Sequence, residues 1–316
     1  MKKYSIITVT LNPCMDKTVQ VERFETGQTN RVLSARTDVG GKGINVARAL
    51  RGCGESFVAT GLVAGVYGRK IVDYLEQSDI QCAFCEAEGE TRVNLKILDA
   101  QTGVMTELNE IGFNAGDAYQ DFTKTLMQFL PEADVLVLSG SIPPDLSTSV
   151  YRDLTVLATS FGVKTILDAD GACLREGIEA KPYAIKPNLR ELETLVGHEL
   201  TSDAQIIAAA QDIAAQGVKL VCVSMGEHGA IFVRDTFVVQ TIPFPIEVGS
   251  AAAAGDSMVA MLSYAAVRGL TLLETARLMT AAGTLTASLP GTQVASFDDI
   301  LARADEIETA IPEEMP

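Results

Sequence analysis

The sequence predicts a doubly wound α/β fold, in which helices flank a large, mostly parallel sheet and a second, small β-sheet stands beside it. Short apolar runs, such as 135–138 and 220–223, alternate with helical stretches along the chain. Such runs are typical of parallel strands buried on both faces, and their alternation with helices is typical of doubly wound sheets. Residues 91–98 instead alternate polar and apolar side chains, which indicates a strand with one covered and one exposed face.

The elements of the large sheet can be placed from these patterns. Its strands are expected at 5–11, 57–63, 134–139, 163–168, 182–186, 218–224, 229–233 and 237–242. Its helices are expected at 44–51, 67–78, 116–129, 145–161, 189–196, 203–216, 256–268, 271–287 and 297–310. Ligands of such sheets bind beyond the carboxyl ends of the strands, so motifs that follow strands are the first candidates for a site.

Two segments do not fit the alternation, at approximately 13–38 and 90–112. We expect them to form one small sheet that is inserted, as a discontinuous lid, into a single α/β domain spanning 1–316. The alternative is that they are two ordinary surface hairpins.

Composition excludes several classes of function. The chain has 316 residues, 47% of them hydrophobic, which is enough for a large core. Its formal net charge of −16 argues against nucleic acid or an anionic membrane as a partner. No apolar run reaches the roughly 18 residues that span a bilayer. The first residues lead directly into the strand at 5–11 without the features of a signal peptide, so we expect a cytoplasmic protein.

The cysteines and histidines are poorly placed for catalysis. Cys82 and Cys85 form the one close Cys-x-x-Cys pair, no second pair exists, and His198 and His228 are the only histidines in the sequence. A four-ligand zinc site and a Ser-His-Asp hydrolase are therefore disfavoured. Carboxylates, lysines and backbone amides must carry the chemistry.

The loop at 250–257 is the central motif. Small residues run up to Gly255 and Asp256, and a helical pattern begins there. A helix start leaves several amide N–H groups without internal partners, and these favour an anion such as phosphate. Asp256 could cap the helix, or it could be a general base that takes a proton from a hydroxyl attacking that phosphate.

A second motif, Gly40-Gly41-Lys42-Gly43, feeds a helix that carries Asn45. Glycines let backbone approach a ligand closely, although a tight strand-to-helix turn is the alternative. Lys42 is followed by glycine, so this is not a Walker A loop, and no Gly-x-Gly-x-x-Gly follows the first strand. The second absence argues against a nicotinamide dehydrogenase.

Polar residues also gather where a sugar phosphate could bind. Asp16 follows the first strand and could accept hydrogen bonds from hydroxyl groups, or form an Asx turn. Arg92, Asn94 and Lys96 share one face of a strand and could hold a phosphate, or simply form a solvated face.

Two further loops follow strands. Asn188 and Glu191 could form a capping box, or they could lie near Mg²⁺ and its water shell. Ser224, Gly226 and Gly229 form a turn beyond a strand end, where a nucleotide would lie.

Taken together, these motifs resemble the ribokinase-like family of sugar kinases, and within it the branch with 1-phosphofructokinase and tagatose-6-phosphate kinase. The resembling segments run through nearly the whole chain in the order of the family. They are 10–16, 40–45, 91–96, 139–143, 186–191, 224–226 and 254–257.

The resemblance implies a large α/β body with a small β lid and transfer of the γ-phosphoryl group of ATP to a sugar phosphate. It implies Asp256 as general base and the amides of Ala253, Ala254, Gly255 and Asp256 as the anion hole. It places Asp16, Gly40, Gly41, Lys42, Asn45, Arg92, Asn94, Lys96 and Ser139 on the sugar side. It places Lys186, Asn188, Ser224, Gly226, Gly229 and Gly255 on the ATP side, with Asn188 and Glu191 organising Mg²⁺. A homodimer formed through the lid is also implied.

One departure bears on activity, because the usual loop of the family reads Ser-Thr-Val-Gly-Ala-Gly-Asp. Ala251 here lacks a hydroxyl, and Ala253 replaces the first glycine of the anion hole. If that position needs a positive φ, alanine costs on the order of 1 kcal/mol. Otherwise only its methyl group could crowd the phosphate.

The expected reaction is phosphorylation of fructose 1-phosphate to fructose 1,6-bisphosphate. The segment 106–113 favours this substrate by resemblance only. A tagatose-6-phosphate kinase is the close alternative. A sugar-phosphate-binding pseudokinase, supported only by the altered loop, is a third.

Overall fold

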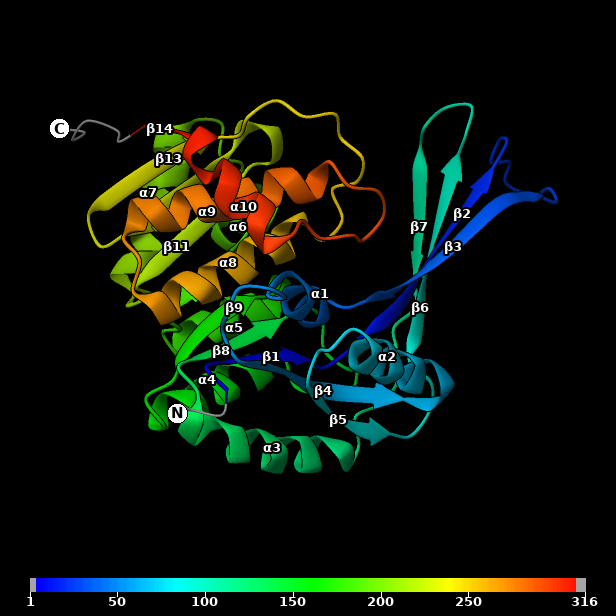
Figure 1. Ribbon diagram of the computed structural model, residues 1–316, viewed down its shortest axis with the longest axis horizontal. Coiled ribbons are helices and arrows are strands. Elements are labelled where there is room, and N and C mark those ends of the chain that lie inside the picture. Colours follow the sequence, from blue (N-terminus) through cyan, green and yellow to red (C-terminus); the bar gives the residue numbers. More distant parts are fainter. Residues whose placement is uncertain (1–3, 311–316) are drawn as a thin grey trace.

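The computed structural model describes residues 4–310, and Figure 1 shows a large helix-covered sheet with a small sheet projecting from it. Residues 1–3, at the start of the chain where no signal peptide was expected, lie outside the described residues. Residues 311–316 of the expected single domain also lie outside them. Within 4–310, no helix is long and apolar enough to cross a bilayer.

The large sheet is mostly parallel, as predicted. Its strand order is β14-β13-β12-β11-β10-β9-β8-β1-β4-β5. The first strands of the chain are β1 (Ile6–Thr10), β4 (Phe57–Ala64), β5 (Cys82–Ala87), β8 (Val135–Ser139) and β9 (Lys164–Asp168). The later ones are β10 (Ala184–Ile185), β11 (Leu220–Ser224), β12 (Ala230–Arg234), β13 (Phe237–Ile242) and β14 (Glu308–Ala310). Strands β5 to β11 are parallel, and β12, β13 and β14 continue the sheet in antiparallel fashion.

Helices cover both faces of this sheet, which makes the fold doubly wound. One layer contains α1 (Lys42–Ala49), α2 (Gly65–Gln77), α8 (Ala254–Arg268), α9 (Leu272–Ala287) and α10 (Phe297–Arg303). The other contains α3 (Ala118–Phe129), α4 (Val150–Ser160), α5 (Gly171–Glu179), α6 (Leu189–Val196) and α7 (Asp203–Ala215). Alternate residues of one strand serve the two layers: Ile6 packs with α8 and its neighbours, and Ile7 packs on the α3 side.

The small sheet has the order β3-β2-β6-β7. Its strands are β2 (Cys14–Val21), β3 (Val32–Gly40), β6 (Arg92–Asp99) and β7 (Met105–Asn109). Because β2 pairs directly with β6, the two atypical segments form one sheet rather than separate hairpins, as expected from their alternation. β3 ends at the Gly40–Gly41 turn, so this sheet leads straight into α1.

One strand of the large sheet, β5, and one helix that packs on it, α5, were not predicted. β5 is a half-buried edge strand, and its Cys82 and Cys85 pack into apolar clusters on opposite faces, so they do not form a pair. α5 contains Gly171 and Gly177, which lower helix propensity. Gly177 is required because a Cβ there would collide with Leu167 of the sheet.

Two predicted helices were too long. The helix expected at 145–161 begins only at Val150, because Asp145 instead accepts hydrogen bonds from the amides of Ala115 and Gly116. The helix expected at 297–310 ends at Arg303. The remaining residues form the short turn η3 (Ala304–Glu306) and the edge strand β14, because pairing with β13 outweighs the local helical pattern.

Candidate active site

Asp256 lies in the first turn of α8, directly after the small-residue loop. The loop enters the helix through Ala253, whose φ of 62° lies in the left-handed region. The sequence argument left the sign of this φ open, and the structure shows that it is positive. No side chain caps the start of α8, so its first amides keep their capacity to bind an anion.

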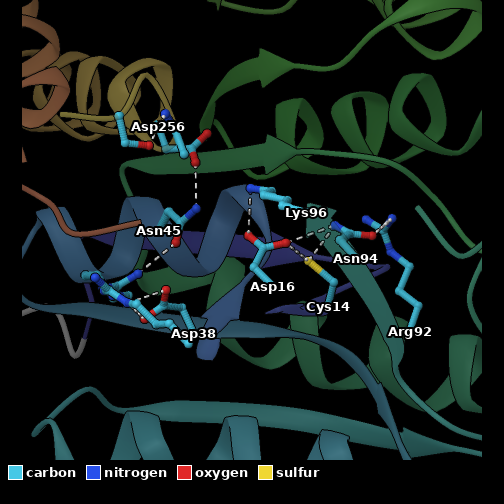
Figure 2. A network of polar contacts seen from close by, with 12 residues as sticks. Cys14, Asp16, Asp38, Asn45, Arg92, Asn94, Lys96 and Asp256 are labelled. Carbon is cyan, nitrogen blue, oxygen red and sulfur yellow. Dashed lines mark hydrogen bonds and ion pairs between the residues drawn. The ribbon is translucent and has the colours of Figure 1, made fainter. Parts of the chain in front are cut away.

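The Asp256 side chain is 6% exposed, but its surroundings are polar. Its Oδ2 accepts a hydrogen bond of 2.8 Å from Nδ2 of Asn45 on α1 (Figure 2). Burial, and then the charge of Asp168, raise the pKa of Asp256 to about 6, and Lys42, Asn45 and Lys186 limit the rise. A carboxyl group with this pKa suits proton transfer near neutral pH.

Two lysines meet on a second carboxylate, that of Asp168 at the carboxyl end of β9. Nζ of Lys42 lies 3.3 Å from Asp168 Oδ1, and Nζ of Lys186 lies 3.4 Å from the same oxygen. Burial alone would raise the pKa of Asp168, but the two ammonium groups lower it below its usual value. Sequence reasoning missed Asp168, although its place at a predicted strand end was a signal.

Lys186 also lies against the start of α8. A Cβ atom at Gly255 would stand 3.2 Å from Nζ of Lys186, so the absence of a side chain at Gly255 lets the ammonium group lie close to the helix backbone. The unpaired amides and this cation therefore act on the same small volume. An anion such as a phosphoryl group would be held there from two sides.

The glycine turn before α1 is built by close approach. A Cβ at Gly43 would collide with the carbonyl oxygen of Val9, and Gly41 has a φ of 124°. A Cβ at Gly40 would lie 2.9 Å from Oδ2 of Asp16. Gly40, Gly41 and Gly43 thus let the end of the small sheet and the start of α1 lie against β1.

The polar face of the small sheet is organised around Asp16. In the register of β2 and β6, Asp16 lies opposite Asn94. Its Oδ1 accepts a hydrogen bond of 3.1 Å from Asn94, and its Oδ2 is 3.6 Å from Nζ of Lys96 (Figure 2). The predicted polar face therefore exists, and Asp16 belongs to it.

Arg92 is more constrained than its sequence context suggested. All five of its N–H groups donate to protein acceptors: the Asn12 carbonyl twice, and once each Asn94, Ser141 and the Glu110 carbonyl. A phosphate could bind Arg92 only by replacing one of these hydrogen bonds. Their lengths of 3.1–3.3 Å are on the long side for charged donors.

The loop before α6 forms the capping box that was one of its two interpretations. Asn188 Oδ1 accepts from the amide of Glu191, and Glu191 Oε2 accepts from the amide of Asn188, both at 2.8 Å. The charge of Glu191 also acts on Lys42, so this helix start faces the lysine cluster. Within residues 4–310, no group of three or more His, Cys, Asp or Glu side chains is arranged to hold a metal ion.

The remaining candidates surround this edge of the sheet. Ser224 at the end of β11 forms a bridge with Asn188, which joins the two loops. Gly229 is required structurally, because a Cβ there would collide with the Thr241 carbonyl, whereas a Cβ at Gly226 would meet open space. Ser139 ends β8, and its buried hydroxyl has no hydrogen-bond partner among the described residues.

The profile of the pfkB family of carbohydrate kinases matches residues 9–299 of this chain. The chain belongs to this family. A 1-phosphofructokinase of Rhodobacter capsulatus is 40% identical over 278 residues, covering 87% of this chain and 88% of that protein. A tagatose-6-phosphate kinase of Staphylococcus epidermidis is 33% identical, covering 96% and 99%. A structure of phosphofructokinase-2 from Escherichia coli in complex with substrates and products has a TM-score of 0.89 at 31% identity, covering 96% and 99%.

The match to the pfkB family confirms the predicted fold and the predicted class of enzyme. A kinase of this family uses ATP as co-substrate. In this member, the buried carboxylate, the uncapped helix start and the two lysines lie together at the carboxyl edge of the large sheet, where ligands of doubly wound folds bind.

The left-handed conformation of Ala253 leads to a stability prediction. Replacing Ala253 with glycine should raise the free energy of unfolding by about 0.5–1 kcal/mol in urea titrations, because glycine adopts positive φ without strain. We expect little change in turnover, since the backbone already holds the geometry. The control is Ala252→Gly, at a residue without positive φ, which should not stabilise the protein. A gain in turnover of about tenfold or more for Ala253→Gly would show that the methyl group crowds the site.

Proposed function

We propose that this carbohydrate kinase transfers the γ-phosphoryl group of ATP to a hydroxyl of a sugar phosphate, with fructose 1-phosphate as the preferred substrate. One observation carries the proposal: the buried Asp256 stands at an uncapped helix start, bonded to Asn45 and close to Lys42 and Lys186. The 1-phosphofructokinase of Rhodobacter capsulatus supports the choice of sugar.

Asp256 acts as general base in this proposal. Its Oδ2 is occupied by Asn45, which leaves Oδ1 to take the proton of the attacking hydroxyl. The hydroxyl oxygen then forms a bond to the γ-phosphorus as the bond from that phosphorus to the oxygen of ADP breaks. The amides of residues 253–256 and the ammonium of Lys186 stabilise the charge that spreads over the phosphoryl oxygens.

The sugar would lie between α1 and the polar face of the small sheet. Asp16 can accept hydrogen bonds from its hydroxyl groups, beside Gly40 and Gly41. Lys96 is held by one ion pair in the described chain, so it is the cation best able to turn towards the phosphate already on the sugar. Arg92 would join it by exchanging its hydrogen bond to Ser141.

Mg²⁺ would enter with ATP. The buried Oδ2 of Asp168 has no hydrogen-bond partner among residues 4–310, and Glu191 supplies a second carboxylate near Lys42. Hard oxygens of this kind fit Mg²⁺, which usually keeps waters and substrate phosphates as its other ligands. Asn188 and Glu191 would act through that water shell, and the ion would neutralise phosphate charge.

A tagatose-6-phosphate kinase is the second candidate, favoured by the Staphylococcus epidermidis relative. The same machinery would serve either sugar, because nothing in the base or the helix start reads the sugar ring. Positive φ at Ala253 retains the loop conformation that its glycine counterpart would adopt, which supports turnover over a pseudokinase.

A substrate screen with a matched variant tests the proposal. Coupled measurement of ADP release with fructose 1-phosphate, tagatose 6-phosphate, fructose 6-phosphate and free sugars should show the highest kcat/KM for fructose 1-phosphate. Asp256→Asn should keep the fold and lower kcat by about a hundredfold or more, since the general base is gone. Turnover near the wild-type value in Asp256→Asn would refute the assignment of the base.

The raised pKa of Asp256 predicts a pH dependence that needs no substrate. The folded state binds this proton with a pKa of about 6, more tightly than an unfolded chain with a value of about 4. The contribution of Asp256 to the free energy of unfolding should therefore fall as pH rises from about 4 to 6. The difference in unfolding free energy between wild type and Asp256→Asn should follow this curve. A difference that stays constant with pH would contradict the raised pKa.

We also propose a homodimer formed through the small sheet. Leu33 on β3 and Leu108 on β7 are 62% and 57% exposed, and further apolar side chains are exposed nearby. In the strand register, Leu108 lies opposite Leu95, on the face away from Asp16. An exposed apolar sheet face of this kind is typical of an interface.

Sedimentation at micromolar concentration tests the dimer. The wild type should sediment as a dimer and Leu108→Lys as a monomer, because a charge buried in the interface would be unpaired. The control is Val156→Lys on α4, where the side chain is 58% exposed and lies on the large body. A monomeric wild type, or a dimeric Leu108→Lys, would remove the small sheet as the interface.

A further inference from the structure

Arg48 lies in the last turn of α1, one turn beyond Asn45. Its Nη1 donates a hydrogen bond of 3.1 Å to Oδ1 of Asn45. Its guanidinium group also lies over the ring of Tyr74 on α2, with Cζ 5.7 Å from the ring centroid. Arg48 is therefore held in place from a second helix while it contacts the residue that bonds Asp256.

The three side chains form a hydrogen-bond chain with one possible direction. A guanidinium group only donates hydrogen bonds, and an ionised carboxylate only accepts them. The Asn45 atom that faces Arg48 must then be its oxygen, so its NH₂ group faces Asp256. Without Arg48, the Asn45 amide could turn over and place its oxygen against the carboxylate.

We propose that Arg48 is a positioning residue for phosphoryl transfer, which fixes the amide of Asn45 so that it donates to Oδ2 of Asp256. The inference rests on the proposed role of Asp256 as base. It adds a residue that lies one contact further from the reacting atoms than Asn45. By engaging Oδ2, the chain also selects Oδ1 as the oxygen that receives the proton.

A purely electrostatic role for Arg48 must be separated from this one. The charged groups that act on Asp256 are Lys42 on α1, Asp168 at the end of β9 and Lys186 after β10. These stay unchanged when Arg48 is replaced. If Arg48 acted only through its charge, its removal would have the same effect whether or not Asn45 is present.

The experiment uses the full chain and the sugar phosphate that gives the highest turnover, with kcat/KM followed from pH 5 to 8. Arg48→Ala should lower kcat/KM at neutral pH by about tenfold, because the base is misplaced. It should also move the acid limb of the profile to higher pH, since the Asn45 hydrogen bond that holds down the pKa of Asp256 is lost. Arg48→Lys keeps a donor and should recover part of both effects.

Two backgrounds make the result specific. Arg51→Ala removes an exposed arginine three residues further along and should match the wild type. In an Asn45→Ala background, Arg48→Ala should move the acid limb no further, because its target is gone. An unshifted limb in Arg48→Ala, or an equal shift in the Asn45→Ala background, would overturn the proposal. If Arg48→Ala unfolds with reduced cooperativity, its fold is perturbed, and the pH profile of Arg48→Lys is used instead. An acid limb of Arg48→Lys that is not shifted from the wild type would then overturn the proposal.

Failure of this inference can be told from failure of the proposed function. Activity retained in Asp256→Asn would remove the base itself. An inactive Asp256→Asn combined with a wild-type profile for Arg48→Ala would remove only the role of Arg48.

Discussion

The site depends on four charged side chains: Asp168, Asp256 and Lys186 are buried, and the side chain of Lys42 is 36% exposed. An unpaired buried charge costs several kcal/mol, so such groups must balance one another. Asp168 holds both lysines through one oxygen, and its pKa is lowered, while that of Asp256 is raised. When their environments shift the pKa values of two carboxyl groups in opposite directions, the two groups can take different protonation states and different roles. Asp168 stays ionised between the two lysines, and Asp256 can hold a proton near neutral pH, which leaves the four groups with a net positive charge.

The small sheet is tied to the large body both by apolar packing, through Met15 and Val39, and by hydrogen bonds. Arg92 on β6 donates to Asn12 in the loop after β1, to Ser141 after β8, and to Asn94 and Glu110 of the small sheet and its end. Arg36 on β3 packs against Gly291 in the loop after α9, where a Cβ would lie 3.0 Å from the guanidinium. Contacts of this kind exchange with water or a substrate phosphate at modest cost. These contacts hold the sheet that carries Asp16 in place against the large body.

Periodicity predicted most of the elements, because a strand buried on both faces and an amphipathic helix leave different patterns in the sequence. It failed for β5, where a half-buried edge strand shows neither pattern, and for β14, where strand pairing replaces a local helix. Local motifs singled out Asn45 and Asp256, and the structure brings these two side chains into hydrogen-bond contact. Asp168 was not predicted as a site residue, because its place in the site comes from its contacts with Lys42 and Lys186. These residues are distant in sequence and meet only in the folded chain. The sequence also did not predict that all the N–H groups of Arg92 already donate hydrogen bonds, because backbone carbonyl acceptors leave no pattern in a sequence.

Ala253 shows how a departure from a motif can leave a backbone conformation in place. A non-glycine residue with positive φ costs on the order of 1 kcal/mol, and it persists only where its surroundings determine the conformation. Here the next residues enter α8, which is buried along most of its length, so the helix dictates the turn. The feature that binds an anion is the direction of the amides, which depends on backbone angles and not on the side chain. Glycine would be the more stable residue at this position, because it adopts positive φ without strain. Alanine keeps the same backbone conformation at a cost in stability.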